Sequence, residues 1–197
     1  MRRADRRPDR PRLFCIGLNK TATSSFHEAV QVLGYRSLHH GGEEVERNVS
    51  AAIEAKAPLL SNLDQRYDAF SDIGQLSRRF VMLSQQYPGS RFVLTVRPLD
   101  EWLDSRRRHA ERNVQAQEAG RRHGRLLVVD EEKWRAEWSD HLEKVHRFFR
   151  NRDDLLEIDL TDDPTWSPLC AFLGRPEPSE PFPWANRDRN IASEGDG

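Results

Sequence analysis

The sequence lacks several features that would place it in a common class. Its two cysteines, Cys15 and Cys170, are far apart along 197 residues, so neither a disulfide framework nor a cysteine-based zinc site is indicated. No apolar run approaches the length that spans a bilayer. Neither sign of charge dominates, because 31 Lys and Arg stand against 32 Asp and Glu. We therefore expect buried free thiols, no membrane association and no nucleic-acid partner.

The two ends of the chain carry little apolar content. Residues 1–12 are rich in Arg and Pro and have no apolar centre, unlike a secretory signal. We expect a disordered leader there, a disordered tail over 191–197, and a cytoplasmic protein. Residues 13–190 are enough chain for a sizeable core, and we expect them to form a single domain.

Short apolar runs alternate with amphipathic segments along the chain. Strands are predicted at Leu13–Ile16, Tyr35–His39, Arg91–Arg97 and Leu155–Leu160. Helices are predicted at about Thr23–Leu33, Glu43–Ala57, Ile73–Gln86, from Asp100 onward, at Glu131–Arg150 and near Trp166–Leu173. The segment Leu59–Ser71 has a mixed pattern, and Leu126–Val129 fits either a short strand or the approach to a helix.

This alternation predicts an α/β fold, a parallel sheet with helices on both faces in three layers. Ligands of such sheets bind beyond the carboxyl ends of the strands. That edge would gather Lys20, His39, His40 and Arg97 towards a common site.

The segment from Gly17 to Ser25 is the strongest candidate for a binding loop. It follows the first predicted strand and runs into the first predicted helix, whose N-terminus carries partial positive charge. Lys20 adds a full charge, and hydroxyl groups come from Thr21, Thr23, Ser24 and Ser25. The loop suits a phosphate-like or sulfate-like anion, although a Ser/Thr-rich helix start with a solvated Lys fits the same residues.

This loop does not match the Walker A pattern of nucleoside triphosphatases. That pattern places Gly immediately before the Lys, whereas Asn19 precedes Lys20 here, and Gly17 lies too close to it.

Three ordered blocks of the chain together resemble the sulfotransferases that use 3′-phosphoadenosine 5′-phosphosulfate (PAPS), in their bacterial and fungal branch. Gly17–Ser25 is similar to that family's 5′-phosphosulfate loop. Tyr87–Ser105 looks like its 3′-phosphate motif, in which a strand ends in Arg and a Ser follows eight residues later. Trp166–Asn186 resembles its C-terminal signature.

The resemblance implies a P-loop-like sulfotransferase fold and an enzyme that moves a sulfuryl group from PAPS to a hydroxyl or amine of a small-molecule acceptor, with no metal. It implies a donor site made by two groups of residues. The loop would bind the 5′-phosphosulfate through Asn19, Lys20, Thr21, Ala22, Thr23, Ser24 and Ser25. Arg97 and Ser105 would hold the 3′-phosphate. Asn186 and Arg187 would touch the nucleotide.

The chain departs from the family pattern at two positions. Ala22 stands where the family commonly has Gly, at a point where the loop backbone would take a positive φ that Ala adopts less easily. Pro98 replaces the frequent Asp after the strand Arg, and Pro suits a strand exit.

The resemblance also implies catalytic roles. Lys20 would neutralise charge on the oxygen that leaves with the nucleotide product. A general base must accept the proton of the acceptor, and Asp72 ranks first for this role, His40 second and Glu43 third. Asp72 is an equally good N-cap for the predicted helix at Ile73.

Two other functions remain open from the sequence. The strand–loop–helix unit also fits a P-loop nucleotide kinase or NTPase, which would bind ATP with Mg²⁺. A non-catalytic relative would keep the nucleotide site without a working base. The acceptor and the oligomeric state are not encoded in any motif of the chain.

Overall fold

The computed structural model of the chain describes residues 11–121 and 127–185. Apart from residues 11 and 12, the expected leader and tail lie outside these ranges. Arg12 is buried, and its carbonyl accepts a hydrogen bond from the Arg91 N–H at 2.8 Å. The chain divides into a first unit, Met1–Val96 with Asn151–Gly197, and a second unit, Arg97–Arg150. The single domain expected over 13–190 stays a prediction.

The first unit is built on a five-stranded sheet in the order β2-β3-β1-β4-β5, and each neighbouring pair of strands is parallel. Its strands are β1 (Leu13–Cys15), β2 (Ser37–His39), β3 (Ala69–Ser71), β4 (Arg91–Val96) and β5 (Leu155–Asp159). The predicted α/β fold with a parallel sheet is confirmed. Because β1 lies in the middle, the loop that follows it opens at the centre of the sheet's carboxyl edge.

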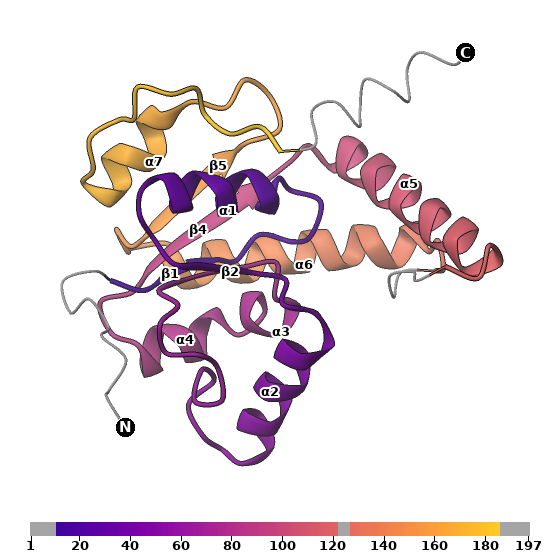
Figure 1. Cartoon of the computed structure of the whole chain (residues 1–197), viewed down its shortest axis with the longest axis horizontal. Helices are drawn as coiled ribbons and strands as arrows, with labels where there is room; N and C mark the ends of the chain where they lie inside the picture. Colours follow the sequence, from indigo (N-terminus) through magenta and orange to yellow (C-terminus); the bar gives the residue numbers. More distant parts are fainter. Residues whose placement is uncertain (1–10, 122–126, 186–197) are drawn as a thin grey trace. The chain divides into compact units, whose positions relative to one another are not determined.

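Helices cover both faces of this sheet (Figure 1). On one side lie α1 (Thr23–Val32) and α7 (Trp166–Leu173), and on the other α2 (Gly42–Glu54), α3 (Gly74–Ser77) and α4 (Phe80–Gln86).

Strand alternation sorts the core between these two sides. Leu13 and Cys15 of β1 pack in a buried cluster with residues of α1 and α7. Phe14 points the other way and stacks between Phe70 and Phe92, with ring centroids 5.4 and 5.6 Å apart. Cys15 and Cys170 are both buried and free, as predicted.

Two elements of the first unit differ from the sequence prediction. Strand β3 lies inside the segment of mixed pattern and was not predicted, because three residues are too few to show a period. The single helix predicted over Ile73–Gln86 is two helices, α3 and α4, separated at Arg78 and Arg79. The apolar spacing of Leu76, Phe80 and Leu83 runs through this break, so periodicity alone does not reveal it.

The second unit is a pair of helices, α5 (Leu99–Glu118) and α6 (Glu131–Phe149). The side chain of Arg106 lies between Trp102 of α5 and Trp134 of α6, 4.9 Å from each ring centroid. Its guanidinium also pairs with Glu137 at 2.8 Å. Residues 127–129, part of the ambiguous segment Leu126–Val129, form neither strand nor helix and lead into α6.

Candidate active site

The loop after β1 is held against β4 at Gly17. A Cβ atom at this position would lie 2.0 Å from Thr95 Oγ1 and 2.5 Å from the Thr95 carbonyl oxygen. Neither distance is compatible with a side chain. Gly17 is therefore required by the close approach of the two backbones, and the loop begins at a fixed distance from β4.

Hydrogen bonds between small polar groups connect the loop to β4 and β1 inside the core. The Thr21 hydroxyl donates to the Leu18 carbonyl at 2.6 Å and lies 2.7 Å from the Thr95 hydroxyl. The Thr95 hydroxyl in turn lies 3.6 Å from Cys15 Sγ. Burial raises the pKa of Cys15 to about 11, so its S–H is retained. The Thr21 hydroxyl therefore uses its one proton in the bond to the Leu18 carbonyl. The Thr95 hydroxyl donates to the Thr21 oxygen.

The loop backbone turns through left-handed conformations at two residues that carry side chains. Lys20 has φ 69°, and Ala22, the N-cap of α1, has φ 60° and ψ 31°. The left-handed region costs an L-residue with a Cβ roughly 1–2 kcal/mol. The structure thus has a positive φ where the family commonly has Gly, and Ala22 adopts it at that cost.

The start of α1 presents groups suited to an anion. The N–H groups of a helix's first turn have no acceptor within the helix. No acidic residue lies in the first turn of α1, and no side chain caps it. These features leave the positive end of the helix dipole uncompensated by a nearby carboxylate.

The hydroxyl residues of this turn are not equivalent. Thr23 and Ser25 are buried, and the Ser25 hydroxyl accepts a hydrogen bond from the Ala185 N–H at 3.1 Å, which ties the C-terminal segment to α1. Ser24 is only half-buried, and its hydroxyl lies 3.3 Å from His39 Nε2. Ser24 is thus the hydroxyl of this turn that is best placed for a ligand.

The residues that follow β2 and β3 are also in left-handed conformations. His40, directly after β2, has φ 60°, and Asp72, directly after β3, has φ 54°. The His40 N–H donates to the Ser71 carbonyl at 2.9 Å, which joins the two strand ends. We call the residues after these three strands, 17–25, 40–41 and 72, the strand-end rim. Strained backbone of this kind clusters at functional sites.

Electrostatics connect the members of the strand-end rim. Burial raises the pKa of Asp72, while the positive charges of His40 and Lys20 act to lower it and Glu46 of α2 acts to raise it. The structure therefore brings together Lys20, His40 and Asp72, the three residues predicted to be catalytic. The N-cap of α3 is Ile73, and no side chain caps that helix, so Asp72 does not have the capping role that competed with catalysis.

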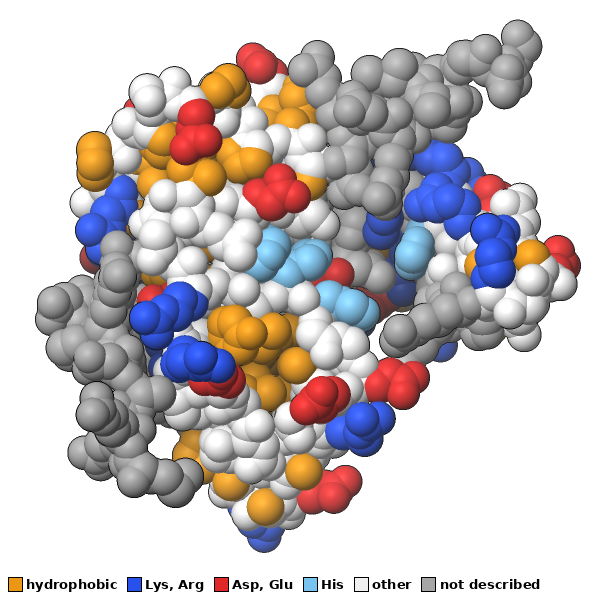
Figure 2. All heavy atoms as spheres, in the orientation of Figure 1, with side chains coloured by type: hydrophobic (Ala, Val, Ile, Leu, Met, Phe, Trp, Pro, Cys, Tyr) orange, Lys and Arg blue, Asp and Glu red, His pale blue; other side chains and the backbone are white. Residues whose placement is uncertain are grey.

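Imidazole side chains gather near the middle of the face shown in Figure 2. The rings of His27 on α1 and His39 on β2 are stacked with centroids 5.1 Å apart. Each bonds a serine hydroxyl: His27 Nδ1 lies 2.8 Å from Ser37 Oγ, and His39 Nδ1 lies 2.9 Å from Ser71 Oγ. The sequence analysis placed His39 at this edge but missed its contact with Ser24, because that pairing depends on how α1 packs on β2.

The remaining predicted residues belong to the second unit, to α2 or to parts of the chain that the structure does not describe. Arg97 and Ser105 belong to the second unit, where Arg97 Nε lies 3.3 Å from Glu101 Oε2 and Ser105 is half-buried on α5. Their assignment to a 3′-phosphate stays a prediction. Glu43 is exposed and pairs with Arg47 at 3.6 Å. Asn186 and Arg187 lie outside the described residues.

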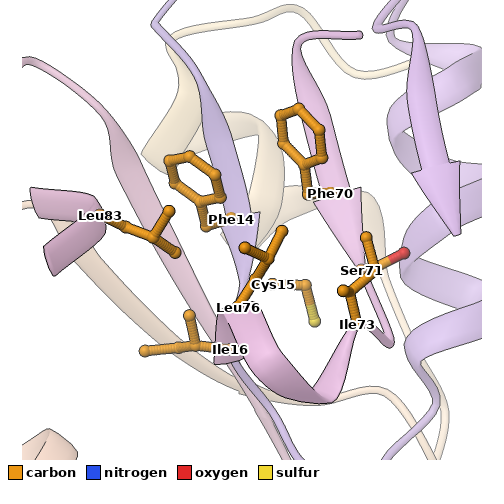
Figure 3. A pocket seen from close by; sticks show the side chains of 8 residues that line it. All are labelled: Phe14, Cys15, Ile16, Phe70, Ser71, Ile73, Leu76 and Leu83. Carbon is orange, nitrogen blue, oxygen red and sulfur yellow. The ribbon is translucent and has the colours of Figure 1, made fainter. Parts of the chain in front are cut away.

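Figure 3 shows the residues that meet next to the strand ends of the first unit. They come from β1, β3, α3 and α4 and from the positions directly after β1 and before α3, and they are mainly apolar. They are Phe14, Cys15, Ile16, Phe70, Ser71, Ile73, Leu76 and Leu83. Among the described residues, these leave no room for even a water molecule between them. The packing supports the rim from below and offers no ligand cavity.

Within residues 11–121 and 127–185, no helix has both the length and the apolar content needed to cross a membrane. Over the same ranges, no three His, Cys, Asp or Glu side chains are grouped so that they could hold a metal ion.

Comparison with known proteins identifies the family of the chain. A search of curated proteins gives no match. The family model described as a sulfotransferase domain matches residues 12–123 and 115–191, which together cover nearly the whole chain. Its matched range includes the strand-end rim, Arg97 and Ser105. The chain therefore belongs to the sulfotransferase domain family, and this supports a transferase activity.

Proposed function

We propose that the protein transfers a sulfuryl group from PAPS to a hydroxyl or amine of a small-molecule acceptor. The observation that carries the proposal is the strand-end rim. There the His40 N–H bonds the Ser71 carbonyl next to Asp72, and the loop with Lys20 opens α1 at the same edge of the sheet. Membership of the sulfotransferase domain family gives the reaction class. PAPS as the donor and the small-molecule acceptor are the proposed parts.

The chemistry of the loop fits the 5′-phosphosulfate of PAPS. That group is anionic and needs donors and positive charge rather than apolar contact. The loop offers the Lys20 ammonium, the first-turn N–H groups of α1 and the half-buried Ser24 hydroxyl. Because Gly17 and Thr21 fix the loop against β4, these hydrogen-bonding groups are held in place before PAPS binds.

Lys20, Asp72 and His40 have the chemical tasks in the proposed reaction. Sulfuryl transfer depends on positioning and on stabilising charge that develops on the leaving oxygen. Lys20 supplies a positive charge for that oxygen. Asp72 accepts the proton of the acceptor, and a raised pKa makes its carboxylate a stronger base than an exposed aspartate. His40 is the second candidate for the same task.

Arg97 and Ser105 are proposed to bind the 3′-phosphate on the strength of the family resemblance. The Arg97 guanidinium is planar and suits a bidentate contact with a phosphate. Its Nε now lies against Glu101, so this carboxylate competes with an anion for the same donor. Arg97→Ala is expected to weaken nucleotide binding, and Glu101→Gln is expected to strengthen it.

Calorimetric titration of adenosine 3′,5′-bisphosphate tests donor binding. The wild type is expected to bind, and Lys20→Ala is expected to weaken the affinity about tenfold or more, because a charge-assisted contact is lost. Lys56→Ala is a matched control, since Lys56 is an exposed lysine that also has a positive φ, 52°. Absence of binding by the wild type would overturn the proposal.

Two further titrations separate the alternative functions. A P-loop kinase or NTPase would bind ATP with Mg²⁺, and we expect no such binding, because the loop lacks the Gly-Lys-Ser/Thr pattern. A non-catalytic relative would bind the bisphosphate yet sulfate no member of a broad acceptor panel. Turnover of a single acceptor in that panel would exclude it.

A further inference from the structure

His39 links the end of β3 to the first turn of α1 through its two ring nitrogens. Nδ1 lies 2.9 Å from Ser71 Oγ at the end of β3, and Nε2 lies 3.3 Å from Ser24 Oγ in the first turn of α1. His39 and Ser71 are also partners in the register of β2 and β3. The position of the ring is therefore fixed by the sheet, and the ring reaches the donor loop from there.

The imidazole of His39 is kept neutral by its surroundings. Burial, together with the neighbouring charges of His27 and His40, lowers the pKa of His39 to about 4. The His27 ring stacks on it from α1. A neutral imidazole has one N–H donor and one acceptor nitrogen, so His39 gives its two serine partners opposite roles.

The direction of these bonds decides what Ser24 can offer a ligand. If Nδ1 carries the proton, Ser24 donates its own proton to Nε2 and faces the loop with lone pairs only, which repel an anion. If Nε2 carries the proton, Ser24 accepts from His39 and its O–H is available to a sulfate or phosphate oxygen. In that arrangement the Ser71 hydroxyl donates to Nδ1.

We propose that His39 is a positioning residue that holds the Nε2–H tautomer between Ser71 and Ser24 and thereby directs the Ser24 hydroxyl proton towards the anionic group of the donor. In this arrangement the buried Ser71, which is 1% exposed, donates to Nδ1, and the half-buried Ser24 accepts from Nε2. This inference rests on the proposed function, since it assigns the anion to the loop. The bond from His39 orients the Ser24 O–H towards the anion before the ligand binds.

Two substitutions at His39 test the direction of the bonds. In His39→Gln the side-chain amide nitrogen can take the place of Nε2 and still donate to Ser24. In His39→Asn the amide reaches only as far as Nδ1 and loses Ser24. We expect the dissociation constant of adenosine 3′,5′-bisphosphate to stay within about threefold of wild type for His39→Gln and to rise about tenfold for His39→Asn.

A double-mutant cycle with Ser24→Ala shows whether His39 acts through Ser24. The effect of His39→Asn is expected to disappear in the Ser24→Ala background, because no hydroxyl remains to be directed. Thermal unfolding of each variant identifies any loss that comes from folding. Additive losses, or equal affinities for wild type, His39→Gln and His39→Asn, would overturn the inference.

Nitrogen-15 NMR of the imidazole in the ligand-free wild type reads the tautomer directly and needs no activity. We expect the proton on Nε2. A proton on Nδ1 in the wild type would overturn the inference while leaving the proposed function intact. Absence of bisphosphate binding by the wild type with Nε2 protonated would instead overturn the proposed function and, with it, the role assigned to the tautomer.

Discussion

The strand-end rim of the first unit and the helix pair of the second unit are held by different forces. In the rim, backbone conformation and short neutral hydrogen bonds fix the geometry, and non-glycine residues take positive φ at Lys20, Ala22, His40 and Asp72. In the helix pair, arginine side chains carry the connections. Arg106 lies between two tryptophan rings, and Arg107 pairs with both Asp104 and Glu131.

This difference indicates whether substitutions in each region should affect activity or stability. Strained backbone persists only where surrounding structure holds it in place, and it is concentrated where chemistry requires groups in fixed positions. Exposed ion pairs contribute about 0–1 kcal/mol each and weaken with salt. Substitutions of rim side chains that face the ligand should therefore affect the reaction more than stability, whereas substitutions of the arginines that stack and form ion pairs in the helix pair should affect mainly stability.

The largest expected effect separates stability from activity at Asp72. Loss of a general base lowers kcat by about 10²–10⁴-fold, so Asp72→Asn should be nearly inactive.

The same variant should unfold at a higher temperature at neutral pH. A carboxyl whose folded pKa is raised binds more protons when folded, so its contribution to stability falls as pH rises, and a neutral amide removes that penalty. Asn also tolerates the left-handed conformation.

Activity profiles against pH and thermal unfolding together check this prediction. Wild-type kcat/KM should fall as pH drops through the raised pKa of Asp72, and the remaining activity of Asp72→Asn should lack that fall. Asp163→Asn is a matched control, because Asp163 also has a positive φ, 42°, and is exposed. An active Asp72→Asn together with an inactive His40→Gln would move the base to His40.

Gly17→Ala should produce the largest loss of stability in the first unit. The added methyl group meets the Thr95 hydroxyl and carbonyl, and overpacking against backbone costs about 3 kcal/mol. For a chain of this length that is a fall in Tm of roughly 6–12 °C. Gly74→Ala is the control, because its new methyl group meets only the end of the flexible Arg78 side chain, at 2.9 Å. A Tm of Gly17→Ala equal to that of Gly74→Ala would show that the loop is not held against β4.

Much of this architecture could be predicted from the sequence because its strongest signals are local. The β-branched run at Arg91–Val96 and the strand–loop–helix around Lys20 show their elements in periodicity and turn chemistry. Parallel strands then bring their carboxyl ends to one edge, which predicted that Lys20, His39 and His40 lie near one another. Asp72 was instead supplied by the family resemblance. Strand β3 was missed because three residues between loops carry no period.

The rest of the site depends on packing that no local pattern encodes. Thr21, Ser24 and Ser25 look alike in the sequence, yet Thr21 bonds Thr95, Ser24 lies against His39 and Ser25 accepts from Ala185. These partners lie on β4, on β2 and in the C-terminal segment, so their identity follows from tertiary contacts. The family resemblance supplied Arg97 and Ser105, which local physics alone would have left as a strand-end Arg and a helix Ser.

Arg106→Lys tests the forces in the helix pair. Lysine keeps the charge for Glu137 but lacks the planar face that stacks on both tryptophans, so a loss of about 1–2 kcal/mol is expected. Chemical denaturation measures it. Arg147→Lys, which changes an exposed pair with Glu143, should cost under about 0.5 kcal/mol. Equal losses for the two variants would show that the tryptophan rings contribute nothing to holding Arg106.

The smallest expected effect has the opposite sign and lies in the donor loop. Ala22→Gly removes the Cβ from a left-handed residue and should stabilise the fold by about 1 kcal/mol. Ala51→Gly, in the exposed middle of α2, should destabilise it by about the same amount, because glycine weakens a helix interior. Denaturation midpoints of the two variants should therefore move in opposite directions. If Ala22→Gly instead destabilises the protein and lowers its affinity for the bisphosphate, the alanine methyl group itself helps to hold the conformation of this loop. Alanine in place of the family's glycine would then be an adaptation and not a tolerated strain.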